Sequence, residues 1–247
     1  MARASLIFTI ALILPASVTG QTLDRRLAAV DDGTVHIEFA ARPGVCGEGI
    51  HDLSSRHETE EWEADCERQP VRVALRIRNH RVVGVRTYVG GRWRTGLAAR
   101  DLGVVRPQEA ARYFLDLAAQ ASDLSGDPVL PATLADSVTI WPSLLGLARS
   151  SRLPEDRRRT AIFWLGQAAG SAVAGALDSI AGDESSGREI RKQAVFALSQ
   201  HSSDEAVPAL IRIARTNRDP EVRRTALFWL GQSEDPRALD LFEQILR

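Results

Sequence analysis

Lysine is nearly absent from this sequence: 31 residues are lysine or arginine, and only Lys192 is a lysine. The formal net charge is −1, so no overall charge draws the chain to nucleic acid or to an anionic membrane, and we expect no nucleic-acid partner. Because arginine carries almost all of the positive charge, arginine clusters are weaker evidence of a binding site here than usual. Outside Leu6–Leu14, no apolar run approaches the roughly 20 residues that a membrane-spanning helix needs.

Residues with catalytic or metal-binding chemistry are also few. Only one of the five histidines, His201, lies in the C-terminal half of the chain. The pair His57–Glu58 lacks the second histidine of a HExxH zinc helix. The sequence contains no G-x-S-x-G, P-loop or Cys-x-x-Cys motif. We therefore expect no catalytic residues, no metal site and no cofactor, and a protein that is not an enzyme.

The N-terminus has the pattern of a secretory signal peptide over residues 1–20. Arg3 supplies a positive charge, Leu6–Leu14 is apolar except for Thr9, and small residues follow Pro15. We expect cleavage near residue 20, no transmembrane segment after cleavage, and a periplasmic or secreted protein. A buried N-terminal helix or a retained anchor is the alternative.

The two cysteines, Cys46 and Cys66, fit export because an even count in an oxidising compartment indicates a disulfide. Such a bridge would stabilise the fold by roughly 3 kcal/mol. Free thiols are one alternative, and a metal site with His51 and His57 is another. The spacings between these four residues match no familiar zinc pattern.

A strand-like pattern covers residues 33–105. Thr34–Ala40 is a candidate strand, and Val71–Ile77 alternates apolar and polar side chains with the period of a half-buried strand. Asn79–His80 suits a turn, and Val83–Val89 returns as the second strand of a hairpin. We expect a small antiparallel sheet.

Charge in this region is segregated, with acidic residues before the hairpin and arginines on it or after it. One interpretation is an arginine face that binds an anion. The other is that the acidic segment folds over the basic sheet, or that both are solvated. No glycine motif for cradling phosphate accompanies the arginines. The residues concerned are Glu58, Glu60, Glu61, Glu63, Asp65 and Glu67, then Arg72, Arg76, Arg78, Arg81, Arg86, Arg92 and Arg94.

A ten-residue phrase occurs three times: RRTAIFWLGQ from Arg158, RKQAVFALSQ from Arg191 and RRTALFWLGQ from Arg223. Self-similarity at this period, 33 and then 32 residues, indicates a stacked array of helical repeats, which we expect over residues 107–247. The first predicted helix is Glu109–Ala121, and a turn-rich stretch follows at Ser122–Pro131. The next predicted helix is Ser137–Arg149. Three helix pairs follow, with second helices at Ala172–Ala181, Asp204–Arg215 and Arg237–Arg247, and Pro154 and Pro220 lie between pairs.

Helical periodicity predicts which side of each repeat is buried. At about 100° per residue, Val222, Ala226 and Trp229–Leu230 share one stripe, which we expect to face the core. Gly231 follows the stripe and is predicted to end its helix in a left-handed turn, as is Gly166. Neighbouring pairs must complete one another's core.

This segment resembles the HEAT repeats, more closely the short phycobilisome-lyase HEAT-like type. Their phrase is Val-Arg-x-x-Ala-x-x-x-Leu-Gly, followed by Val-Pro-x-Leu in the second helix. The resemblance covers roughly residues 137–247 and implies an α-α superhelix, so that the whole chain has an α+β fold. The matching residues are Val222, Arg223, Ala226, Leu230 and Gly231 in the last copy, and Ile190, Arg191, Ala194, Leu198 and Val207–Leu210 in the middle one.

The function implied by this resemblance is binding, because such repeats serve mainly as scaffolds. We interpret the chain as an exported, non-catalytic scaffold for protein–protein interaction, with an unidentified protein partner. A ligand- or anion-sensing protein that uses the arginine-rich sheet is the alternative, and a lyase-like enzyme or chaperone is a lesser one. No polar capping repeat follows the last helix, so we expect that end to self-associate or to be closed by a partner.

Phenylalanine recurs where these repeats usually carry an exposed polar residue, at Phe163, Phe196 and Phe228. Phe228 lies roughly 200° from the centre of the buried stripe. We predict an aromatic ladder that binds a partner, unless the N-terminal region or curvature between layers covers it. Glutamines that we expect to form hydrogen bonds at helix ends also recur, at Gln167, Gln200 and Gln232.

Overall fold

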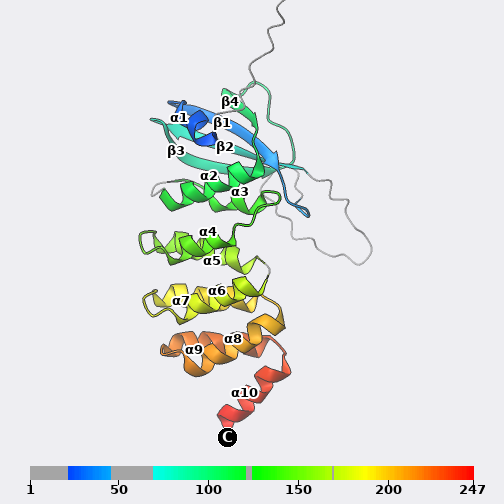
Figure 1. Ribbon diagram of the computed structural model, residues 1–247, viewed down its shortest axis with the longest axis vertical. Helices are drawn as coiled ribbons and strands as arrows, with labels where there is room; N and C mark the ends of the chain where they lie inside the picture. Colours follow the sequence, from blue (N-terminus) through cyan, green and yellow to red (C-terminus); the bar gives the residue numbers. More distant parts are fainter. Residues whose placement is uncertain (1–21, 46–68, 121–123, 169) are drawn as a thin grey trace, which may run out of the picture.

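A computed structural model shows an elongated α+β molecule, with a sheet at one end and helices stacked away from it (Figure 1). The predicted signal peptide and the predicted disulfide between Cys46 and Cys66 lie outside the described part of the chain. The described residues are 22–45, 69–120, 124–168 and 170–247.

Four strands form the sheet: β1 (Gly33–Ala40), β2 (Pro70–Arg78), β3 (Arg81–Val89) and β4 (Ala99–Val104). Their order is β3-β2-β1-β4, and β1, β2 and β3 are antiparallel as predicted. Asn79 and His80 in the β2–β3 turn have φ of 48° and 59°, the left-handed backbone of a tight hairpin turn. β4 was not predicted, and it pairs parallel to β1, so the sheet is mixed rather than wholly antiparallel.

Two helices, α2 (Pro107–Gln120) and α3 (Val129–Leu134), pack on the apolar face of the sheet, and α1 (Leu23–Ala28) packs against α2. This face carries the alternate residues Val35, Ile37 and Phe39 of β1, all buried. The ring of Phe39 lies 6.4 Å from that of Phe114 in α2. α2 was predicted, whereas α1 was not, and α3 lies partly in the stretch expected to be turn-rich.

Seven further helices form the stack: α4 (Trp141–Arg149), α5 (Glu155–Gly166), α6 (Ser171–Gly182), α7 (Arg188–Ser199), α8 (Ser203–Thr216), α9 (Pro220–Gln232) and α10 (Pro236–Leu246). These bounds agree with the predicted second helices to within two residues, except that α4 begins at Trp141 rather than at Ser137. Ser137 has φ of 54°, a left-handed conformation that a right-handed helix does not contain.

The layers of the stack are offset from the repeats in the sequence. The closest packing joins α4 to α5, α6 to α7 and α8 to α9, so each second helix lies against the first helix of the next repeat. Figure 1 shows these pairs as successive layers, with α10 at the far end. The first helices α5, α7 and α9 also pack on one another in order. One core therefore runs from the sheet through the stack.

The glycines of the repeated phrase do not adopt the left-handed turn expected of them, which corrects the prediction. Gly166 is the last residue of α5, Gly231 is the next to last residue of α9, and neither has a positive φ. A Cβ on Gly166 would lie 3.0 Å from the Cβ of Ala197 and 3.1 Å from its Cα. Gly166 is therefore required for the close approach of α7, whereas a Cβ on Gly231 would meet only Phe242, at 3.9 Å.

The predicted buried stripe is largely confirmed. Val222, Ala226 and Leu230 are fully buried in α9. Trp229 is only partly buried, because it lies at the edge of the stripe. Its ring packs 5.1 Å from that of Phe196 on α7.

Ionic contacts tie neighbouring first helices together. Arg188 Nε and Arg191 Nη2, both in α7, donate to Asp219 Oδ2 at 2.8 Å and 2.9 Å. Asp219 Oδ1 accepts from the backbone N–H of Glu221 at 2.9 Å, so the same carboxylate caps the start of α9. The arginine that begins the middle phrase is thus a structural link between repeats.

Candidate functional site

The recurring phenylalanines form an aromatic face on the first helices, made of Phe163 on α5, Phe196 on α7 and Phe228 on α9. Phe163 is 42% exposed and Phe228 is 57% exposed, while Phe196 is half-buried. Each occupies the helix side away from the buried stripe, as helical periodicity predicted for Phe228. Because α5, α7 and α9 are neighbours in the stack, these side chains lie on successive helices of one surface.

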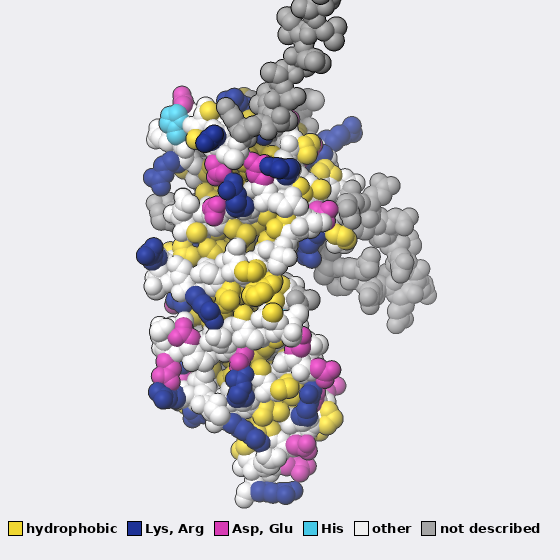
Figure 2. Space-filling view, in the orientation of Figure 1, with side chains coloured by type: hydrophobic (Ala, Val, Ile, Leu, Met, Phe, Trp, Pro, Cys, Tyr) yellow, Lys and Arg dark blue, Asp and Glu magenta, His cyan; other side chains and the backbone are white. Residues whose placement is uncertain are grey.

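Two tryptophans support the aromatic face from below. The Phe163 ring meets Trp164 edge-on at 5.1 Å, and Phe228 meets Trp229 at 5.0 Å. Trp164 Nε1 donates to Asp127 Oδ2 at 3.3 Å. These edge-to-face contacts hold the exposed rings in place while leaving much of their surface open. Figure 2 shows hydrophobic side chains at the surface of the stack, with basic and acidic side chains around them.

The recurring glutamines stand at helix ends, as predicted. Gln167 and Gln200 follow the last residues of α5 and α7, and Gln232 is the last residue of α9. Gln200 Nε2 donates to Ser199 Oγ at 3.1 Å. This local hydrogen bond gives Gln200 a structural role at the end of its helix.

A second candidate site lies on the polar face of the sheet. Because β4 pairs with β1 at the edge opposite β3, the connection of residues 90–98 must pass across the sheet to reach it. This connection and the strands below it enclose a hollow of about 640 Å³. Ala74 sits at its centre, between His36 on β1 and Arg86 on β3 in the strand register. The short side chain of Ala74 leaves that space open.

Aromatic rings form one wall of this sheet cavity. Trp93 stacks flat on His36, with ring centroids 3.7 Å apart and planes at 6°. Tyr88 on β3 meets Trp93 edge-on at 5.8 Å. Trp93 thus bridges β1 and β3 above the intervening strand and fixes the position of the connection.

The charge around the sheet cavity is positive. Arg72 is paired with Glu38, Nε to Oε2 3.2 Å, and it also donates to the carbonyl of Gly90 at 2.9 Å. The other cavity arginines, Arg86, Arg92 and Arg94, are exposed and have no bonding partner among the residues that the structure describes. No aspartate or glutamate belongs to the described lining.

Burial favours the uncharged form of the histidine beneath Trp93. His36 is only 6% exposed, and burial lowers its pKa from the ordinary value of 6.5, although the nearby carboxylate of Asp101 acts in the opposite direction. A neutral imidazole can stack on an indole and still offer one donor and one acceptor nitrogen. The permanently charged groups among the cavity's described lining residues are arginines.

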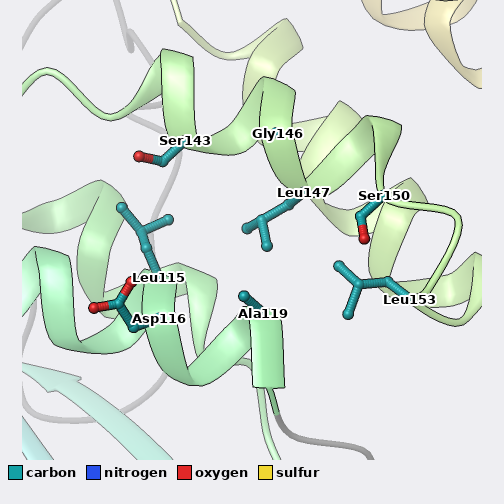
Figure 3. Close-up of a pocket in the computed structure, with 8 residues that line it drawn as sticks. All are labelled: Leu115, Asp116, Ala119, Ser143, Gly146, Leu147, Ser150 and Leu153. Carbon is teal, nitrogen blue, oxygen red and sulfur yellow. The ribbon is translucent and has the colours of Figure 1, made fainter.

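A smaller groove of about 280 Å³ lies between α2 and α4, where the sheet layer meets the stack (Figure 3). Leu115, Ala119 and Leu147 face it, and Asp116 is the one charged side chain in its lining. It has no second charged or aromatic group to orient a ligand. We interpret it as loose packing at the junction of two layers.

The sequence indicated some residues of these sites and missed others. Phe163, Phe196 and Phe228 were named from the sequence, and their binding role stays a prediction; Arg72, Arg86, Arg92 and Arg94 were among the basic residues noted there. Trp93 was missed, although its position between two arginines after Gly90–Gly91 was a signal. Cys46, Cys66 and the acidic segment before the hairpin lie outside the described residues.

The described residues contain neither a membrane-spanning helix nor a metal-binding cluster. None of their helices has the length and hydropathy to cross a bilayer. None of their acidic, histidine or cysteine side chains gather in groups of three that could hold a metal ion.

The C-terminal repeats match a known family. No curated protein matches the chain. A solved structure, the complex of CpcE and CpcF of phycocyanin lyase from Nostoc sp. PCC7120, is similar at 28% identity and a TM-score of 0.36, over 44% of this chain and 42% of that one. Residues 184–247 match the family of HEAT repeats. The family match confirms the HEAT-like repeats that were recognised from the sequence.

Proposed function

We propose that this chain is an exported, non-catalytic scaffold that binds a partner protein through its aromatic face. The observation that carries the proposal is the exposure of Phe163 and Phe228, 42% and 57%, on first helices of one packed stack. Exposed aromatic rings supported by packed neighbours are typical of the residues that dominate binding energy at protein interfaces.

The HEAT-like repeats support the same function, because solenoid stacks of this kind present extended surfaces for protein partners. The partner surface that suits the aromatic face is itself apolar, since burying Phe rings against polar groups would leave those groups without hydrogen bonds. A partner helix or strand with an apolar side, lying across α5, α7 and α9, meets this requirement.

The test is affinity capture from an extract of the source cells with three forms of the full chain. The Phe163→Ser/Phe228→Ser variant should lose the captured protein, while a Leu239→Ser variant should retain it. Leu239 is the matched control because it is 61% exposed but lies on the second helix α10. Circular dichroism should show unchanged helicity in both variants. Equal capture by all three forms would exclude the aromatic face as the binding surface.

Phe196 is left unchanged in this experiment, because its ring packs on Trp229 between neighbouring helices. Its replacement would confuse loss of binding with loss of packing.

Export is part of the proposal and is supported by the signal-like pattern of residues 1–20 alone. Expression in a bacterial host followed by cell fractionation and N-terminal sequencing tests it. The expected result is a processed protein outside the cytoplasm that begins near Gln21. An unprocessed protein in the cytoplasmic fraction would contradict export and would leave the binding test unaffected.

A further inference from the structure

The sheet cavity combines three features that a surface hollow rarely has together. Its volume of about 640 Å³ lies within the range of roughly 300–1,000 Å³ that small-molecule sites occupy. Aromatic rings form one wall, and arginines without partners among the described residues surround it. None of these features is needed for the HEAT-like stack at the other end of the molecule.

The charge distribution selects the kind of ligand. Three exposed guanidinium groups around one hollow repel one another, in a chain whose net charge is only −1. A ligand with one or two carboxylate or phosphate groups would relieve this repulsion, and guanidinium groups bind such oxyanions through paired, charge-assisted hydrogen bonds. Arg72 contributes less, because Glu38 and the Gly90 carbonyl already engage two of its nitrogens.

The aromatic wall indicates the nature of the uncharged part of the ligand. Trp93 is held by a flat stack on His36 and an edge contact with Tyr88, yet it remains partly exposed at the cavity. A rigid ring system of this kind favours a planar organic group, which loses little conformational freedom when it packs there. An inorganic anion would contact the arginines but would leave this wall unused.

We propose that the sheet cavity binds a planar organic anion, with its acidic group paired to Arg86, Arg92 and Arg94 and its ring against Trp93 and Tyr88. This site is separate from the aromatic face, and neither requires the other.

Isothermal titration of the full chain tests the proposal with four probes. Phenyl phosphate and isophthalate carry both a ring and an anionic group, inorganic phosphate carries only the charge, and benzamide carries only the ring. At least one of the first two should bind about tenfold more tightly than either control probe. Which of the two binds better identifies the acidic group as phosphate or carboxylate.

Variants locate the binding. Arg86→Ser and Arg94→Ser should each weaken binding of the better probe by about tenfold, the usual effect of losing one charge-assisted hydrogen bond. Arg81→Ser is the matched control, since Arg81 is an exposed arginine on the same strand but lies outside the cavity lining. It should leave binding unchanged. Trp93→Leu should remove the preference for the ringed probe over inorganic phosphate, with circular dichroism to verify the fold.

Three results would overturn the proposal. Absence of binding by both ringed anions excludes the site for this ligand class. Equal affinity for inorganic phosphate excludes the role of the aromatic wall. An equal loss on Arg81→Ser and Arg86→Ser shows diffuse attraction to a basic surface rather than a site.

Discussion

The two ends of this molecule are built by different rules. In the helical stack, the exposed phenylalanines recur because each repeat places the same residue at the same point of a first helix, as with Phe163 and Phe228. In the sheet region, the cavity arises once, where the β3–β4 connection crosses the polar face and Trp93 stacks on His36. A repeated surface suits an extended partner, whereas a single enclosed hollow suits a small one.

The largest expected effect contrasts a buried phenylalanine of the sheet region with an exposed phenylalanine of the stack. Phe114 is fully buried between α2 and the sheet, so Phe114→Ala should destabilise the fold by about 3–5 kcal/mol. Phe228→Ala, on the exposed face of the stack, should change stability by no more than about 0.5 kcal/mol. Denaturant unfolding of both variants measures the difference. Similar losses would show that Phe228 belongs to the core.

A smaller effect distinguishes two equivalent glycines within the stack. Gly231→Ala should stabilise the chain by up to about 1 kcal/mol, because alanine favours the helix and its Cβ meets only ordinary contact. Gly166→Ala should destabilise it by about 1–3 kcal/mol, because the new Cβ would press on the backbone of Ala197. Thermal unfolding should give shifts of opposite sign. Shifts of the same sign would contradict the close α5–α7 approach.

The smallest effect concerns the ionic link between α7 and α9. The hydrogen bond from Arg188 holds the pKa of Asp219 below its ordinary value of 3.8. A lowered folded-state pKa means that Asp219 stabilises the fold above pH 3.8 and that this contribution is lost as the pH falls through the lowered pKa.

Asp219→Asn should therefore lower the unfolding midpoint at neutral pH, and its difference from the wild type should shrink as the pH falls below about 4. Thermal unfolding from pH 7 to pH 2 measures this. A difference that stays constant across the range would show that the ionised carboxylate contributes nothing to the link.

Local periodicity made most of the stack predictable. The second helices, the buried Val222, Ala226 and Leu230, and the outward phenylalanines all follow from helical periodicity within the repeats, because each repeat imposes the same packing on its neighbours. The role of Gly166 was not predictable from the phrase, since Gly231 occupies the same position and only the packing against Ala197 separates them.

The sheet region was predictable only within the hairpin. β4 lacks the alternation of β2 and contains Gly103 at φ 68°, so its pairing depends on β1, more than 60 residues away in the chain, rather than on its own residues. The sheet cavity depends in turn on that pairing, because it forces residues 90–98 across the polar face. The arginines were visible in the sequence, but the aromatic wall that turns them into a site was not.

The most direct test of the proposed scaffold is photocrosslinking from within the aromatic face. Benzoylphenylalanine in place of Phe228, in the full chain exposed to source-cell extract, should form a discrete adduct with the protein that the wild type captures. The same group in place of Leu239 should form none. A common adduct at both positions, or none at position 228 while capture persists, would contradict binding through this face.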